Sequence, residues 1–359
     1  MTQREKEILA LIQSDPMIQQ QDIADQLGIA RSSVAVHISN LIRKGYIAGK
    51  GYVLRSGCYT VVVGGVNVDI GGRSFAPLIT ADSNPGTVTV NLGGVGRNIA
   101  HNLSLMGADV RLLAAYGDDA HGAQVAASCA ALNIDLSNGL RVPGGTTSTY
   151  VYLMDHTGEM ALAVSDMSIC EKVSPAYLAE KLPLLRGARV VVADANIPAE
   201  SLRYLAESCD VPLFVDPVST TKAEKLRPIL GKIHTLKPNR LEAELLSGVT
   251  IRETKDVETA ARTLLGLGVK RVFISLGAEG VCAAEGEQVI WLKNLPGRMV
   301  NTTGCGDAFM AALVWAFLEE LDLEGSALAG LAAGSIAMES PETINPHMSA
   351  EVLKTRMGQ

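Results

Sequence analysis

Residues 301–309 read Asn301-Thr302-Thr303-Gly304-Cys305-Gly306-Asp307-Ala308-Phe309, and they indicate the architecture more strongly than any other segment. The apolar segment 309–318 predicts a helix, so the small residues stand at a helix N-terminus. Their backbone N–H groups can point into one space, where the helix dipole favours an anion. Asp307 could then accept a hydroxyl proton while this anion hole stabilises a transferring phosphoryl group. A glycine-rich helix start with Asp307 as a cap explains the same residues.

Upstream of this segment, apolar strands alternate with amphipathic helices. Strands are predicted at 59–64, 110–116, 189–193, 212–215, 235–236 and 271–276. Helices are predicted near 97–107, 119–132, 175–185, 198–208, 221–230, 239–247 and 256–267. This alternation predicts an α/β fold with a doubly wound parallel sheet covered on both faces. Two stretches alternate apolar and polar residues instead, and predict a small antiparallel β lid at about 70–92 and 146–166.

Two further motifs suit a polyol ligand. The turn Gly93-Gly94-Val95-Gly96-Arg97-Asn98 allows close approach of a ligand to the backbone, and Asn98 can hydrogen-bond a hydroxyl. Asp69 follows the first core strand, at the sheet edge where parallel sheets bind ligands, and can accept two hydroxyls. A tight turn and a capping aspartate are the alternative interpretations.

Two other motifs suit a nucleotide. Asn239 and Glu242 follow a strand and share one helical face, which suits water-mediated magnesium at a phosphate. A capping box explains the same pair. Ser275-Leu276-Gly277-Ala278-Glu279-Gly280 ends a strand and is either a nucleotide loop or a hairpin turn.

The order of these motifs resembles the ribokinase or PfkB-type carbohydrate kinase family, over residues 58 to about 348. A narrower resemblance, to the pseudouridine kinase branch, rests on the segments 81–86, 93–98, 157–160, 165–167, 192–197, 214–219 and 233–244. The family resemblance implies a ribokinase-like sheet with a β lid, through which such proteins often dimerise. It also implies ATP and Mg²⁺ as cofactors.

The resemblance assigns roles residue by residue. Asp307 is the implied catalytic base, and the implied anion hole consists of Gly304, Cys305 and Gly306. The implied ribose contacts are Asp69, Gly94 and Asn98. The implied ATP loop contains Ser275, Gly277 and Gly280, while magnesium and phosphate would be governed by Asn239 and Glu242. Further nucleoside contacts near the lid are expected at Asp82, Asn84, Asp166 and Asn196.

Two residues depart from the family pattern. Cys305 stands where the family usually has Ala, so a thiol lies at a helix N-terminus, a setting that lowers thiol pKa values. We interpret it as a small residue that fits, with redox sensitivity as the alternative. Asn301 stands where many relatives have Asp near a monovalent-cation site. Potassium therefore remains an open expectation that would depend on backbone carbonyls.

The first 55 residues follow a different pattern, with seven basic and five acidic residues in a chain of net charge −7. Helices at 4–13, 21–27 and 30–44 followed by a glycine-rich hairpin at 45–54 predict a winged helix-turn-helix domain over 1–55, preceding a kinase domain over 58–359. Arg31, Ser32 and Ser33, with His37 one turn on, would face the major groove. Lys44 and Lys50 could meet phosphates. A helical packing or dimerisation module is the alternative.

Composition excludes other classes. Hydrophobic residues make up 47% of the chain, which suits a globular interior. No apolar run approaches the roughly 20 residues of a membrane span. The six cysteines are scattered without metal-ligand spacing, which fits a reducing cytoplasm.

The expected function is an ATP-dependent nucleoside kinase that phosphorylates pseudouridine to its 5′-phosphate, in a cytoplasmic homodimer with a DNA-binding head. Two alternatives stay open: a kinase for another nucleoside or sugar, and a ligand-sensing transcriptional regulator on a kinase fold.

Overall fold

The structure is a computed structural model of the whole chain, and it describes residues 2–15, 17–44, 46–47 and 59–358. The chain divides into two compact units, Met1–Cys58 and Tyr59–Gln359. Most of the predicted wing, including Lys50, lies outside the described residues. No helix in the described part of the chain is long and apolar enough to cross a membrane.

The N-terminal unit contains three helices, as the sequence predicts: α1 (Gln3–Ser14), α2 (Gln20–Leu27) and α3 (Arg31–Arg43). A capping box between Thr2 and Glu5 starts α1, and Gly28 ends α2 with φ of 62°. The apolar faces of the helices form one core, whose buried members include Ile8, Ile12, Ile23, Val34, Ile38 and Leu41.

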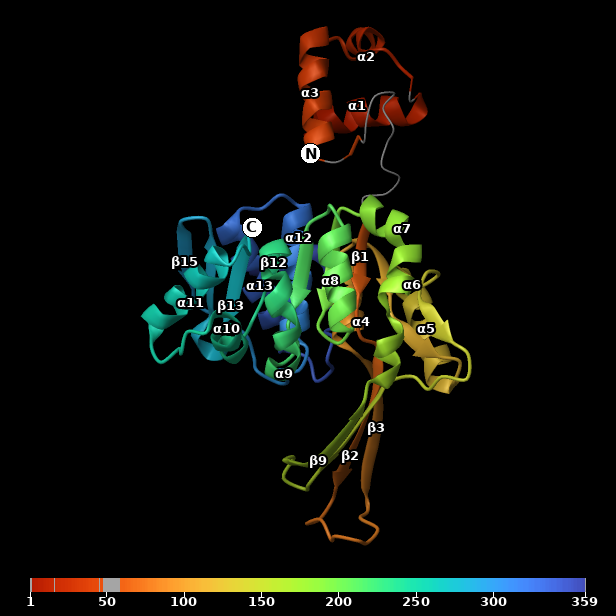
Figure 1. Cartoon of the computed structure of the whole chain (residues 1–359), viewed down its shortest axis with the longest axis vertical. Coiled ribbons are helices and arrows are strands. Elements are labelled where there is room, and N and C mark those ends of the chain that lie inside the picture. Colours follow the sequence, from red (N-terminus) through yellow and green to blue (C-terminus); the bar gives the residue numbers. More distant parts are fainter. Residues whose placement is uncertain (1, 16, 45, 48–58, 359) are drawn as a thin grey trace. The chain divides into compact units, whose positions relative to one another are not determined.

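The second unit is built on a nine-stranded sheet with the order β15-β14-β13-β12-β11-β10-β1-β4-β6 (Figure 1). Its strands are β1 (Tyr59–Val63), β4 (Asp109–Leu113), β6 (Ile134–Asp135), β10 (Val190–Asp194), β11 (Leu213–Asp216), β12 (Thr235–Leu236), β13 (Arg271–Ser275), β14 (Val281–Glu285) and β15 (Gln288–Leu292). Neighbours from β6 to β13 are parallel. β14 and β15 add an antiparallel edge.

The structure corrects the predicted strands in two places. The prediction missed the edge strands β14 and β15 on one side of the large sheet and β6 on the other. The run 110–116 is not one strand, because its end forms β5 (Ala115–Gly117), which pairs with β7 (Leu140–Val142) in a separate two-stranded sheet. Both halves of that run are largely buried and apolar, so the local pattern carries no sign of a change of partner.

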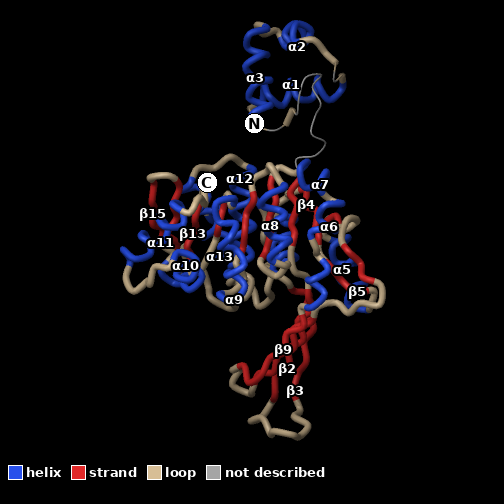
Figure 2. The backbone as a smooth tube through the Cα atoms, viewed as in Figure 1, coloured by secondary structure: helices blue, strands red, loops and turns tan. Residues whose placement is uncertain are grey.

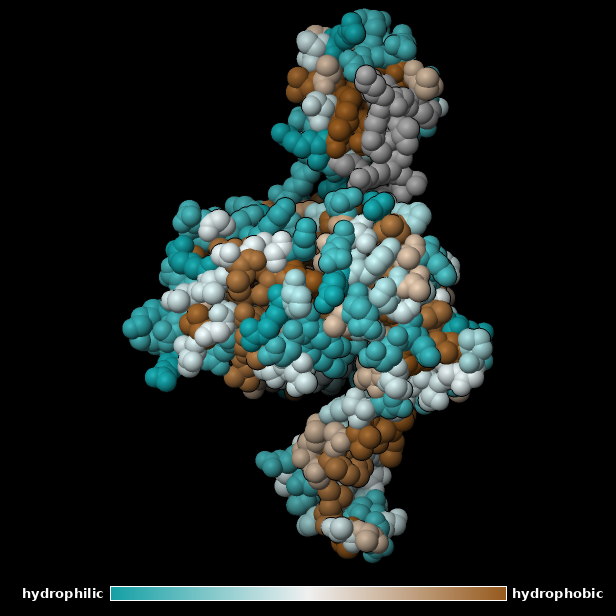
Figure 3. Space-filling view, in the orientation of Figure 1, coloured by the Kyte–Doolittle hydropathy of each residue, from teal (hydrophilic) through white to brown (hydrophobic). Residues whose placement is uncertain are grey.

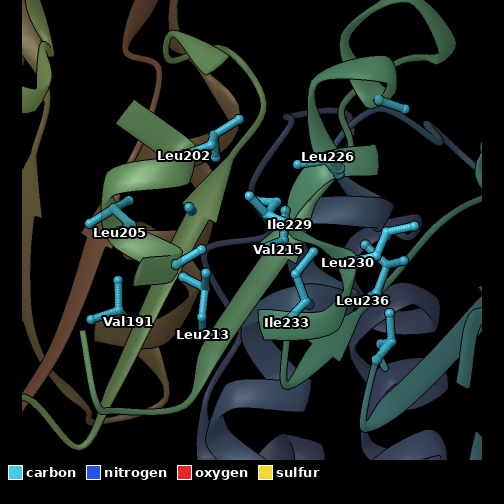
Figure 4. Close-up of a cluster of buried hydrophobic side chains, with 14 of the residues drawn as sticks. Val191, Leu202, Leu205, Leu213, Val215, Leu226, Ile229, Leu230, Ile233 and Leu236 are labelled. Atoms are coloured by element: carbon cyan, nitrogen blue, oxygen red, sulfur yellow. The ribbon is translucent and has the colours of Figure 1, made fainter. Parts of the chain in front are cut away.

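Helices cover both faces of the large sheet, which confirms the doubly wound architecture. One face carries α6 (Pro175–Glu180), α7 (Leu182–Gly187), α8 (Ala199–Ser208), α9 (Thr220–Ala223), the 3₁₀ helix η2 (Glu224–Lys232), α10 (Arg240–Ser247) and α11 (Thr254–Gly266). The other face carries α4 (Val95–Leu105), α5 (Ala120–Ala131), α12 (Cys305–Leu318), α13 (Leu323–Ala337) and α14 (Ala350–Arg356). Strand β1 shows the pleat that serves both cores, since Val61 and Val63 face the first layer and Val62 the second. Figure 4 shows part of the first core, where Leu202 and Leu205 of α8 lie near Val191 of β10 and Leu213 of β11.

The lid is a separate four-stranded sheet that projects from the body (Figure 2). Its strands, in the order β3-β2-β8-β9, are β2 (Asn67–Ser74), β3 (Gly86–Gly93), β8 (Thr149–Met154) and β9 (Met160–Asp166). The central pair β2–β8 is parallel, so the lid is mixed rather than wholly antiparallel. Apolar side chains gather on it (Figure 3), and its exposed members include Val88, Val90, Leu153, Met160, Leu162 and Val164.

Candidate active site

Two buried aspartates end neighbouring strands of the sheet. Asp194 closes β10 and Asp216 closes β11, and the two are register partners. Asp194 accepts hydrogen bonds from the backbone N–H groups of Gly65 and Asn196, both at 2.8 Å. Burial raises the pKa of Asp194, and Asp216 raises it further. Both carboxyl groups therefore lie at the carboxyl ends of parallel strands, where such sheets bind ligands.

Asp307 reaches the same edge from the first turn of α12. Asn98 Nδ2, in the first turn of α4, donates a hydrogen bond to Asp307 Oδ2 at 2.8 Å, across 209 residues of sequence. Burial raises the pKa of Asp307 to about 8, and Asp216 contributes to the rise. The Asn98 hydrogen bond and the Lys237 charge oppose the shift. A carboxyl group with this pKa can exchange a proton near neutral pH, as general base chemistry requires.

Lys237 supplies the positive charge of the site. Its ammonium lies 3.2 Å from Asp216 Oδ2, and both side chains are buried. A Cβ atom built on Gly306 would lie 3.5 Å from Lys237 Nζ, which places the ammonium at the N-terminus of α12. A buried cation beside the N-terminus of a helix favours an anion at this position.

A pocket of about 510 Å³ opens beside this cation. It unites the two motifs that the sequence assigned separately to ATP and to the anion hole, because its lining includes Ser275, Gly277, Gly280, Cys305 and Gly306. Apolar side chains form much of the rest, including Leu295, Met299, Phe309, Leu331 and Met338. One apolar pocket that ends at a cationic, N–H-rich corner suits a nucleotide base with its phosphates.

Glycine is required at the start of both helices. Gly304, the N-cap of α12, has φ of 84°, and a Cβ atom there would lie 2.2 Å from the Thr343 carbonyl oxygen. Gly94, the N-cap of α4, has φ of 98°, and its Cβ would lie 2.4 Å from the Gly65 carbonyl oxygen. Only glycine fits either conformation without displacing backbone.

Asp69 and Asn196 lie beside the glycine residues that precede α4 and follow β1. A Cβ built on Gly93 would lie 2.3 Å from Asp69 Oδ2, so this carboxylate rests against the glycine turn of α4. Asp69 Oδ1 accepts a hydrogen bond from Asn67 Nδ2 at 2.6 Å. Asn196 lies beside Gly65, and its Oδ1 accepts from Lys222 Nζ at 2.5 Å. Asp69, Gly94, Asn98 and Asn196 thus share one polar surface next to Asp307.

Comparison with known proteins agrees with this geometry. Residues 59–350 match the sequence model of the pfkB family of carbohydrate kinases. The chain belongs to this family. Residues 1–48 match the winged helix-turn-helix DNA-binding model, so the pfkB domain follows a helix-turn-helix domain.

Similar proteins extend over nearly the whole chain. The sugar kinase YeiI of Escherichia coli K12, described as uncharacterized, is 42% identical and covers 98% of each chain. The pseudouridine kinase of the same organism is 39% identical over 82% of this chain and 95% of its own. A crystal structure of a sugar kinase from Clostridium perfringens is 31% identical with a TM-score of 0.77, and covers 84% of this chain and 96% of its own.

In this pfkB kinase, Asn239 and Glu242 form the capping box of α10 that the sequence offered as the alternative. Glu242 N donates to Asn239 Oδ1, and Asn239 N donates to Glu242 Oε2, both at 2.9 Å. Burial raises the pKa of Glu242. An isolated bridge joins Asn239 to Ser275 at the nucleotide pocket. The cap leaves Glu242 Oε1 for other chemistry, so the two interpretations are compatible.

Three of the expected nucleoside contacts lie on the lid of the pfkB domain. Asp82 and Asn84 are in the exposed loop between β2 and β3, at the end of the lid away from the body (Figure 1). The Asn84 side chain accepts a hydrogen bond from Ile79 N and donates one to the Ile79 carbonyl. Asp166 ends β9 at the lid base, where it is exposed and accepts from Ser168 N at 3.0 Å. Asp82 and Asn84 thus lie at the end of the lid away from the body, whereas Asp166 lies at its base, and nucleoside contact by the three stays a prediction.

The two departures from the family pattern have structural explanations. Burial raises the pKa of the Cys305 thiol, and the neighbouring Asp307 raises it further. A raised thiol pKa argues against the redox-sensitive alternative and agrees with the interpretation of Cys305 as a small residue that fits. The Asn301 side chain closes its own loop, donating to the Pro341 carbonyl at 3.1 Å and accepting from Thr303 N at 3.0 Å.

On the helix-turn-helix unit, Arg31, Ser32 and Ser33 are exposed in the first turn of α3, and His37 is half-buried one turn on. Lys44, expected at a DNA phosphate, lies 3.3 Å from Glu5 Oε2 instead. The exposed first turn is the surface that a recognition helix needs.

Sequence reasoning assigned no role to Asp194, Asp216 or Lys237. A usable signal was present, since each aspartate closes a buried apolar strand. Lys237 directly follows β12 and precedes the Asn239 motif. A charged residue directly after a buried strand could have been assigned to the edge of the sheet where parallel sheets bind ligands.

Proposed function

We propose that this pfkB kinase transfers the γ-phosphoryl group of ATP to the 5′-hydroxyl of a nucleoside, with pseudouridine as the acceptor. The observation that carries the proposal is the position of Asp307. Its carboxyl group lies at the N-terminus of α12, bonded to Asn98 on the polar surface and beside the cationic corner of the nucleotide pocket.

The residues divide the chemistry between them. Asp307 accepts the hydroxyl proton, while the N–H groups of Gly304, Cys305 and Gly306 and the Lys237 ammonium stabilise the transferring phosphoryl charge. Asp69, Gly94 and Asn98 orient the ribose, and Asn196 would contact the base. ATP occupies the pocket lined by Ser275, Gly277 and Gly280.

The proposal of a Mg²⁺ ion follows from the side-chain oxygen atoms of Asn239 and Glu242. Asn239 and Glu242 would hold Mg²⁺ through bound waters, because the cap uses only one oxygen of the Glu242 carboxylate. Mg²⁺ would neutralise phosphate charge. A potassium ion would depend on backbone carbonyls, because the Asn301 side chain already bonds to Pro341 O and Thr303 N.

The choice of acceptor is supported by the pseudouridine kinase of Escherichia coli, which aligns with the kinase domain at 39% identity. The more similar sugar kinase, at 42%, supports the alternative of another nucleoside or a free sugar. Five free cysteines in the described part of the chain support a reducing, cytoplasmic setting.

An ADP-release assay with the full chain over a panel of pseudouridine, uridine, cytidine, inosine, ribose and fructose 6-phosphate tests the acceptor. We expect pseudouridine to have a kcat/KM at least roughly 10-fold above the others, because lost hydrogen bonds to a polar substrate are costly. A higher kcat/KM for ribose or fructose 6-phosphate would reject pseudouridine, and no turnover with any acceptor would reject the kinase proposal.

A second function is supported by the helix-turn-helix match and the exposed first turn of α3. We propose that Arg31, Ser32, Ser33 and His37 read DNA, in a homodimer whose second copy covers the apolar lid face. A dimer presents two half-sites, which strengthens the weak binding of one module.

Gel shifts at low salt on a pool of duplexes, with and without pseudouridine, test the DNA proposal, and sedimentation measures the mass. We expect a dimer that shifts DNA, and a loss of the shift in Arg31→Ala. The matched control is Arg203→Ala, an exposed arginine of the kinase unit. Absence of binding by the wild-type chain would leave only the enzyme, whereas binding without turnover would favour the ligand-sensing regulator.

A further inference from the structure

Arg97 is a buried arginine at the base of the lid, and none of the roles above uses its side chain. It stands in the first turn of α4 and is 5% exposed. Arginine is almost never this buried without partners that compensate its charge. The neighbouring residues already have roles, Gly94 as the N-cap of α4 and Asn98 as the partner of Asp307. The buried guanidinium has none so far.

The guanidinium connects the lid to the body. Nη1 donates to the Leu92 carbonyl at 3.2 Å, and Nη2 donates to Ser128 Oγ at 2.9 Å. Leu92 lies near the end of β3 and pairs with Val68 of β2, whereas Ser128 belongs to α5 of the body. One buried side chain therefore links the base of the lid to a helix of the body.

Asp69 is the acidic group whose charge interacts with this guanidinium. Burial raises the pKa of Asp69, and the charge of Arg97 acts against that shift. The other titratable neighbours of Arg97 are Cys129 and His101. Burial raises the pKa of Cys129 and lowers that of His101 to about 4, so both are neutral at pH 7. The Arg97 cation thus has Asp69 as its anionic neighbour.

Position and charge lead to one inference. We propose that Arg97 is a positioning residue for the acceptor, which holds the lid base against α5 so that Asp69 stays beside the glycine turn at 93–94. Asp69 follows Val68 directly, and Val68 is the register partner of Leu92, whose carbonyl accepts the Arg97 hydrogen bond. The identity of the acceptor rests on the proposed function, whereas the link between lid and body does not.

Arg356 provides a matched comparison at the other end of the site. Its Nη1 donates to the Pro296 carbonyl at 3.2 Å, and its Nη2 lies 3.0 Å from Glu339 Oε2. Pro296 follows Leu295, which lines the nucleotide pocket. Loss of Arg356 is therefore expected to affect ATP rather than the acceptor.

The kinetic test uses the full chain and whichever compound of the panel gives the highest wild-type kcat/KM. In Arg97→Met we expect the acceptor KM to rise roughly 10- to 100-fold, the effect of losing charge-assisted hydrogen bonds, while the ATP KM stays within about twofold. Arg97→Lys keeps the charge and should recover part of the loss. Arg356→Met should raise the ATP KM instead. An equal rise of both KM values in Arg97→Met, or no rise, would overturn the proposal.

A second readout needs no turnover. Hydrogen exchange followed by mass spectrometry reports local opening of residues 90–93, the end of β3 that lies at the lid base. We expect faster exchange there in Arg97→Met and wild-type exchange in Arg356→Met. If the wild-type chain phosphorylates nothing on the panel, the proposed function fails, and exchange alone decides the positioning role. Wild-type exchange at the lid base in Arg97→Met would contradict it.

Discussion

Asp307→Asn is expected to lower kcat by about 10³-fold, because removal of a general base costs 10²- to 10⁴-fold. Asparagine keeps the shape and can still bond to Asn98, so the KM values for ATP and acceptor should change little. The measurement is steady-state ADP release with the best acceptor. Asp210→Asn, at an exposed aspartate, is the matched control and should keep wild-type turnover. Retention of more than about a tenth of kcat would exclude Asp307 as the base.

The pH dependence of wild-type turnover tests the same assignment. Since burial raises the pKa of Asp307 to about 8, the protonated, inactive form predominates below that pH. We expect kcat/KM to rise about tenfold per pH unit up to near pH 8 and then to level off. The folded protein binds this proton more tightly than the unfolded chain does, so the carboxylate costs stability as the pH rises toward 8. Asp307→Asn should therefore melt no lower than wild type at pH 8, and a flat activity profile between pH 6 and 9 would contradict the raised pKa.

Lys237→Met is expected to damage both folding and activity. The substitution leaves Asp216 buried without its ion-pair partner, which costs about 3–5 kcal/mol of unfolding free energy. It also removes the ammonium beside Gly306, and we expect kcat to fall about 10²-fold or more through lost stabilisation of phosphoryl charge. Urea unfolding and ADP release measure the two effects. Lys232→Met, at an exposed lysine, is the control for loss of a lysine alone.

A double variant separates the two consequences. Lys237→Met with Asp216→Asn removes the uncompensated charge, and replacing both members of a buried ion pair is often nearly neutral for stability. We therefore expect recovery of most of the unfolding free energy without recovery of kcat. If turnover returned together with stability, Lys237 would be a structural residue and would have no direct part in phosphoryl transfer.

Local rules accounted for much of the site. Gly304 and Gly94 are readable from the sequence because a positive φ at a helix N-cap is a property of a few consecutive residues. The same holds for the Asn239 capping box. It also holds for the three N-terminal helices, because no end of a predicted helix differs from the observed end by more than one residue. The unpredicted β14 and β15 lacked a clear period of their own. Their strand character is stabilised by pairing, of β14 with β13 and of β15 with β14.

The sequence by itself determined the alternating strands and helices, the glycine turns and Asp307 at a helix N-terminus, because backbone conformation and capping depend on neighbouring residues. Only the tertiary structure decided which side chains meet. The Asn98–Asp307 bond and the Asp216–Lys237 pair depend on strand order and on how far each helix extends over the sheet. It also decided that the pKa values of Asp307 and Cys305 are raised, because desolvation depends on everything that packs around a group.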